Sequence, residues 1–133
     1  MNICNVSDIF SLELVASHAH WKMKLDIAIA KEESLDAELL SRDDCCVLGK
    51  WLHDGGKQFI DLQSYRNCLV KHAIFHIEAG KIAECINAQN YEYALQLLDS
   101  STSDFNQTSE EVVSSICCLE NDLKEAKNSI CQS

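Results

Sequence analysis

The feature that most constrains the fold is the near absence of helix-breaking residues: the 133-residue chain has no proline and only four glycines. Proline and glycine are the residues that most often interrupt regular structure, so long helices are expected here. Apolar residues make up 47% of the chain, which is too many for a disordered composition and enough for one core. We therefore predict an all-α fold: an antiparallel four-helix bundle with an additional short helix, as a single domain over residues 1–133.

Apolar residues recur at spacings of three and four in three long segments, predicted as helices over residues 7 to about 33, 64 to about 87 and 91 to about 128. Ser64 can cap the second of these, and the third can break in two near residues 100–104. A short helix is predicted between the first two, with Asp43 and Asp44 as caps at its start and Gly55-Gly56 at its end. Such a helix is too short to be stable alone, so packing or a metal must hold it.

The formal net charge of −10, from 21 acidic and 11 basic residues, argues against binding to nucleic acids or to anionic membranes. No apolar run approaches the roughly 20 residues of a membrane helix. The N-terminal residues have no basic segment and no cleavage pattern, so a signal peptide is not expected. We therefore predict a cytoplasmic protein whose eight cysteines are reduced thiols. Four of them lie in apolar helical runs and are predicted to pack in the core: Cys68, Cys85, Cys117 and Cys118.

His72 and His76 are four residues apart in a predicted helix, so their imidazoles lie on one face, one turn apart. In the first helix His18 falls on the apolar stripe of Leu14, Trp21, Leu25 and Ala28, and a cysteine, Cys45 or Cys46, opens the short helix. Buried histidines need partners for both ring nitrogens, and one shared cation explains three of them better than separate partners. Three imidazoles and one thiolate form a tetrahedral set that suits zinc.

Three motifs in this order resemble the chemoreceptor zinc-binding (CZB) domain family: H-x-x-W-K in residues 18–22, C-x-[LF]-G-K-W in residues 46–51, and H-x-x-x-H in residues 72–76. The resemblance covers roughly residues 10 to 125. It implies the zinc ligands His18, Cys46, His72 and His76. It also implies that His18 is the ligand and not His20, and that Cys46 is the ligand and not Cys45. The other members of these pairs, and His53, are expected at the surface or in local packing.

Four protein ligands close the coordination sphere of zinc, whereas a catalytic zinc keeps one position open. Residues 73–75 contain no glutamate of an H-E-x-x-H motif. We therefore expect a binding module and not an enzyme. The family resemblance implies a sensory or regulatory role, in which zinc or oxidants act on a chemoreceptor or a diguanylate cyclase, and a homodimer. The chain carries neither output domain, so we expect a stand-alone member or a fragment. A zinc buffer or delivery protein is the alternative.

Overall fold

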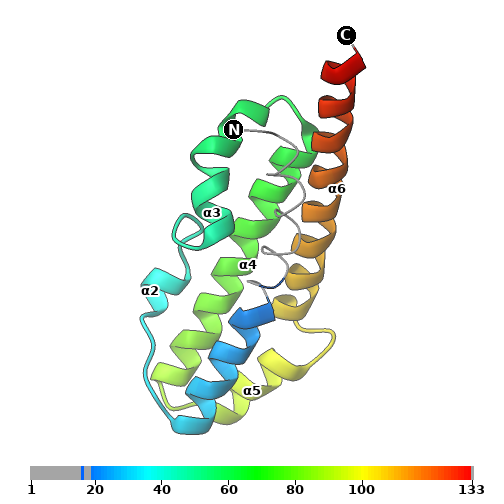
Figure 1. The fold of residues 1–133 in the computed structure, drawn as a ribbon. Coiled ribbons are helices and arrows are strands. Elements are labelled where there is room, and N and C mark those ends of the chain that lie inside the picture. The colour runs from blue at the N-terminus through cyan, green and yellow to red at the C-terminus, as the bar shows by residue number, and fades with distance from the viewer. Residues whose placement is uncertain (1–15, 17–18, 133) are drawn as a thin grey trace.

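A computed structural model of the chain describes residue 16 and residues 19–132, and the side chains of these residues as far as residue 125. Every regular element in this described part is helical, which confirms the predicted all-α class (Figure 1). The first helix occupies residues 19–31. The elements that follow are α2 (Ala37–Leu40), α3 (Val47–Leu52), the 3-10 helix η1 (Gly55–Phe59), α4 (Gln63–Asn87), α5 (Tyr91–Asp99) and α6 (Asp104–Gln132).

The helix α4 is the centre of the molecule and packs against α2, α3, α5 and α6. In Figure 1 the first helix and α4 run downward, α6 returns upward, and the short elements α2 and α3 rise together along one side. The predicted helical bundle is thus present, and the short elements α2, α3 and η1 lie between its first helix and α4. The third predicted long helix is interrupted at residues 100–103, where short polar side chains predicted a break. It therefore forms two helices, α5 before the break and α6 after it.

The core follows the helical period that the sequence shows. On α4 every third or fourth residue is buried, in the series Tyr65, Cys68, His72, Phe75, His76, Ala79, Ile82, Ala83 and Ile86. Leu25 and Ala28 of the first helix are buried in the same core, whereas Leu14 and His18 lie outside the described residues. The buried face of α4 therefore carries two imidazoles in the middle of a hydrophobic core, which requires polar partners for both.

Two expectations about helix starts are wrong. Ser64 is not the cap of α4, because the helix already begins at Gln63 and Leu62 holds the capping position. Asp43 and Asp44 do not cap α3 either, because the backbone reaches the helix only at Cys46, which is the N-cap. Both aspartates lie in the preceding loop, where they bind other side chains.

The prediction that four cysteines pack in the core holds fully for Cys68 and in part for Cys85, which packs against the core. Cys68 is buried and Cys85 is half-buried, but Cys117 and Cys118 are exposed. The buried stripe of α6 passes through Val112, Ile116, Leu119 and Leu123, and the two cysteines fall between its members on the outer face. The six cysteines whose side chains are described are free thiols.

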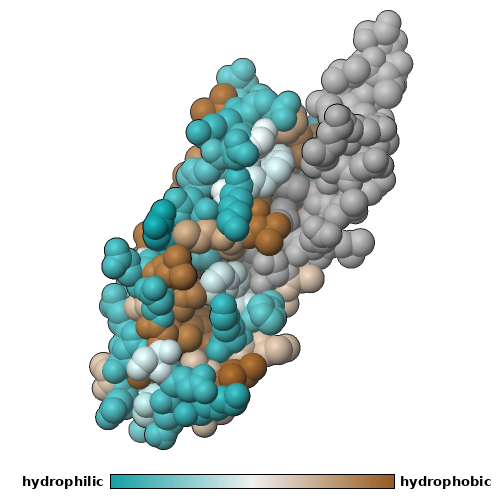
Figure 2. Space-filling model, turned by 60° about the vertical axis from the view of Figure 1, so that its left-hand side comes forward, coloured by the Kyte–Doolittle hydropathy of each residue, from teal (hydrophilic) through white to brown (hydrophobic). Residues whose placement is uncertain are grey.

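The surface mixes polar and apolar residues. On the face in Figure 2, hydrophobic residues form several separate patches among hydrophilic ones. Exposed apolar side chains occur on most elements, among them Met23, Leu39, Val70 and Leu95. Among the described residues, no helix combines the length and the apolar character needed to cross a membrane.

Candidate metal centre

The centre of the site is the pair of imidazoles on α4. His72 and His76 are 0% and 1% exposed, so both rings are removed from water. Their ring centroids are 4.5 Å apart at an interplanar angle of 76°, as expected for residues one helical turn apart. The α4 helix has 25 residues and a continuous buried face. The two rings are therefore fixed by the core, and neither can leave it without disrupting the packing.

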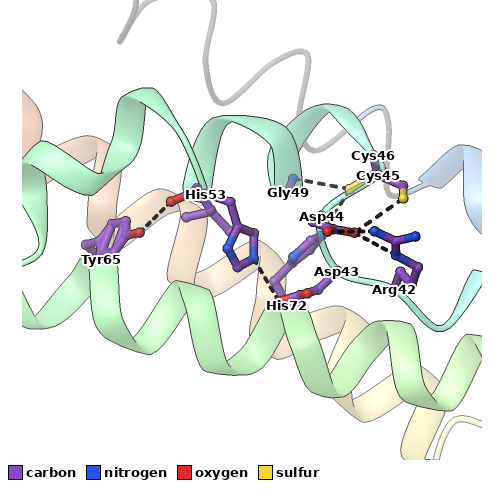
Figure 3. Close-up of polar contacts among 10 residues, drawn as sticks. Arg42, Asp43, Asp44, Cys45, Cys46, Gly49, His53, Tyr65 and His72 are labelled. Carbon is purple, nitrogen blue, oxygen red and sulfur yellow. Dashed lines mark hydrogen bonds and ion pairs between the residues drawn. The ribbon is translucent and has the colours of Figure 1, made fainter.

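Cys46 brings a sulfur atom to this pair from α3. Its Sγ lies 3.1 Å from Nε2 of His72. Cys46 is also the N-cap of α3, and its Sγ accepts a hydrogen bond of 3.3 Å from the backbone N–H of Gly49 (Figure 3). One donor atom from each of Cys46, His72 and His76 lies within 4.8 Å of the other two. The structure thus brings together three of the residues that the sequence singled out.

Gly49 is what lets the loop before α3 come close enough to place Cys46. A Cβ on Gly49 would collide with the carbonyl oxygen of Asp43 and would lie 2.8 Å from its carbonyl carbon. The loop is closed by side chains as well: Asp43 Oδ2 is 3.0 Å from Nε2 of His53, beyond the end of α3. Leu48 and Leu52 are fully buried. Packing and a crossing loop therefore hold this six-residue helix.

A second set of contacts fixes the ring of His76. Its Nδ1–H donates a 2.9 Å hydrogen bond to the carbonyl oxygen of Leu40, at the end of α2. This bond places the proton on Nδ1 and leaves the lone pair on Nε2, the nitrogen that remains for a metal. The approach of α2 depends on Gly80, where a Cβ would lie 2.8 Å from Cβ of Ser41. Sequence reasoning missed this support. Gly80 was the signal in the sequence, because a glycine in the interior of a long helix often marks a place where another segment packs closely.

Burial changes the pKa values of two of the donors, Cys46 and His76, in opposite directions. Burial raises the pKa of the Cys46 thiol, and the N–H groups of Gly49 and Leu48 oppose this shift. Burial lowers the pKa of His76, partly opposed by its hydrogen bond to Leu40. Burial thus disfavours the charged forms, the thiolate and the imidazolium. A neutral imidazole can bind a metal as it stands, whereas the thiol must first lose its proton.

The described donors fit a zinc ion. Ligands of a tetrahedral zinc, with bonds of about 2.0 Å to nitrogen and about 2.3 Å to sulfur, lie roughly 3.3–3.6 Å from one another. The separation of 3.1 Å between Cys46 and His72 and the overall limit of 4.8 Å bracket that range. One sulfur and two nitrogens are a soft to borderline set that favours zinc over magnesium or calcium. A tetrahedral site needs a fourth donor, and the predicted one, His18, lies outside the described residues.

The other residues considered from the sequence take supporting or surface positions. His20 is exposed. The ring of Trp21 packs perpendicular to that of His76, with centroids 5.3 Å apart, and so shields the site. Trp51 of α3 stacks instead on Phe59 of η1, with ring centroids 6.1 Å apart. The thiol of Cys45 donates a hydrogen bond of 3.3 Å to a carboxylate oxygen of Asp44.

Comparison with known proteins gives one match. The sequence model of the family described as the chemoreceptor zinc-binding domain matches residues 18–83. This range contains all three motifs and every residue of the cluster. No curated protein and no solved structure matches the chain.

Proposed function

We propose that residues 18–83, which belong to the chemoreceptor zinc-binding domain family, bind one zinc ion through His18, Cys46, His72 and His76. The observation that carries the proposal is the convergence of Cys46, His72 and His76 within 4.8 Å, from α3 and α4. The hydrogen bond from His76 to Leu40 supports it, because metal-binding histidines usually donate their second ring N–H to a fixed acceptor. His18 is carried over from the family motif.

The same ligand set favours a binding module over an enzyme. With four protein donors no position is left for a water molecule or a substrate. Trp21 and Phe75, whose rings contact that of His76, are aromatic and bring no acid–base group to it. The proposed site thus has the four protein ligands and the aromatic surroundings that suit a stable, closed zinc centre.

We propose further that the chain is a cytoplasmic regulatory module that reports zinc, acting as a homodimer on a chemoreceptor or cyclase partner. The family resemblance and the distribution of the donors support this role. Two histidines lie on a rigid helix, whereas Cys46 lies at the start of a six-residue one. Bound zinc would tie the short segment to the first helix and to α4. Structural zinc contributes about 10–16 kcal/mol of apparent binding free energy in small folding-coupled domains.

Oxidation of Cys46 is a second signal that the same site could report. A zinc-bound cysteine is a thiolate, the form that oxidants attack, and a sulfenic acid is a poorer ligand. Mild peroxide should therefore release zinc from the loaded wild type. If a Cys46→Ser protein, once loaded with zinc, released the metal at the same rate, Cys46 would not be the target.

Metal analysis of the purified chain tests zinc binding directly. Wild type should hold one zinc per chain after dialysis, and His72→Ala and Cys46→Ala should lose most of it. Cys45→Ala is the matched control, because it removes the neighbouring thiol, which bonds to Asp44, and should keep the metal. Full zinc content in Cys46→Ala would refute the assignment.

Unfolding and metal-transfer experiments together address regulation and simple zinc storage. If zinc is the signal, urea melts with and without a chelator should differ, because the short segment is held in one state and released in the other. Superimposable melts would contradict a zinc-dependent conformation. Rapid transfer of the metal to acceptor proteins would favour a zinc buffer or delivery protein.

A further inference from the structure

A cavity of about 240 Å³ opens onto the metal cluster from the surface. Its lining includes the two donors Cys46 and His76, the apolar side chains Trp21, Leu39 and Leu40, and the charged residues Lys24 and Arg42. A water molecule occupies about 30 Å³ of liquid, so the cavity has room for a small molecule of several heavy atoms. The other two cavities described, along α4 and α6 and beside α5, are lined by none of the three described donors.

The charges at this cavity are unusual for the molecule. The chain as a whole has a net charge of −10, yet among the described lining residues the two charged side chains, Lys24 and Arg42, are cationic. Lys24 is held over the ring of Trp21, with Nζ 5.2 Å from the ring centroid. That ring packs perpendicular to the ring of His76. The ammonium group is therefore placed one aromatic ring away from a donor of the cluster.

Arg42 contributes less positive charge than Lys24. Its guanidinium binds both carboxylate oxygens of Asp44, at 3.1 and 3.0 Å, and Glu38 also acts on it. This pairing partly neutralises Arg42 and fixes its position at the cavity. Lys24 has no carboxylate partner among the ion pairs found within the described residues. The preference of the cavity for negative charge should thus depend mainly on Lys24.

We propose that this cavity is the port through which small anionic thiol ligands reach the metal centre and exchange its zinc, and that Lys24 sets the preference for negative charge. The inference rests on the proposed zinc site and adds a route and a ligand class to it. As an incoming thiolate binds zinc and Cys46 is displaced, the Cys46 sulfur takes up a proton from solvent. Ligands of this class are short thiols that carry a carboxylate.

A charge series of thiols tests the port. Mercaptoacetate, 2-mercaptoethanol and 2-mercaptoethylamine are similar in size and differ by a negative, a neutral and a positive group. The rate of zinc transfer from the loaded chain to a coloured indicator is measured with each thiol at low ionic strength. Rates are expressed relative to those for a free zinc–histidine complex, which removes intrinsic differences among the thiols. In wild type the normalised rate of zinc transfer should be highest with the anionic thiol, intermediate with the neutral thiol and lowest with the cationic thiol.

Two variants with matched controls locate the effect. Lys24→Gln should reduce the ratio of anionic to cationic rates about tenfold, and 0.5 M salt should remove most of the wild-type preference. Lys31→Gln, the same charge change at the end of the same helix, should leave the ratio within twofold of wild type. Leu39→Trp fills the cavity from an exposed position and should slow all three thiols. Leu95 on α5 is similarly exposed, at 41% against 48% for Leu39, and Leu95→Trp should not slow them.

The outcomes are distinct from a failure of the proposed function. If the chain holds no zinc, the site itself is refuted before any rate is measured. If it holds zinc but the three normalised rates agree, or Lys24→Gln and Lys31→Gln behave alike, the port is refuted and the zinc site stands. Unchanged rates in Leu39→Trp would show that ligands enter by another route.

Discussion

Replacing Gly49 by alanine tests whether the loop before α3 is what places Cys46. In the interior of a helix alanine is favoured over glycine by about 1 kcal/mol, so propensity alone predicts a gain in stability. The new Cβ, however, would collide with the carbonyl oxygen of Asp43 and approach Cα of Asp44 to 3.1 Å. Both obstacles are backbone, which cannot rotate away as a side chain can. Overpacking typically costs about 1–3 kcal/mol, and with no flexible neighbour we expect the upper part of that range.

The net result for Gly49→Ala should be a loss of about 1–2 kcal/mol in the free energy of unfolding of the metal-free chain, measured by urea denaturation. Because the displaced loop carries Cys46, zinc affinity from a competitive titration should also fall at least about tenfold, the size of effect seen when support around a ligand is lost. Gly55→Ala is the matched control, since its Cβ would meet only Trp51 side-chain atoms at 3.8 and 3.9 Å. A Gly49→Ala protein as stable as wild type, with unchanged affinity, would refute the reasoning.

Two further predictions concern titration and thiol reactivity. Burial lowers the pKa of His76 below its usual 6.5, so in acid the unfolded chain takes up a proton that the folded chain does not. The unfolding free energy of the metal-free protein should therefore fall as the pH drops below about 6.5, and zinc should be lost in the same range. A urea series from pH 8 to 5 checks this, and a slope unchanged in His76→Gln would contradict it. Among the cysteines, exposed Cys118 should react quickly with a thiol reagent, whereas burial raises the pKa of Cys68 to about 11 and should delay its reaction until unfolding. Peptide mass spectrometry after timed labelling distinguishes the two, and equal rates would show that Cys68 is accessible.

The sequence predicted the parts of the fold that follow from the spacing of side chains. The buried face of α4 was read correctly because one period covers its whole length. The break before α6 was also readable from its short polar residues. The same period, applied more strictly, would have placed Cys117 and Cys118 outside, since neither falls on the stripe through Ile116 and Leu119.

The features that sequence reasoning missed depend on backbone atoms and on close approach. The acceptor for His76 is a carbonyl oxygen, and every residue has one, so nothing in the sequence marked Leu40. The N-cap of α3 is a thiol and not one of the aspartates that usually hold that position. Cys46 thus accepts the hydrogen bond of a cap and lies at the metal cluster at once, a double role that the residue pattern does not reveal.

The distribution of the donors determines where the effect of zinc should be felt. His72 and His76 share the buried face of α4 with Phe75 and Ala79, so moving either ring would open the core. Cys46 can move with the segment from α2 to η1, which is held by fewer buried residues and by exposed polar contacts such as the pair of Asp43 and His53. Polar contacts at the surface contribute little to stability. We therefore expect the difference between the loaded and the metal-free chain to be concentrated in that segment. It is also the segment that, with Lys24 and Trp21, encloses the cavity over Cys46, so loss of zinc and widening of its route of exit should occur together.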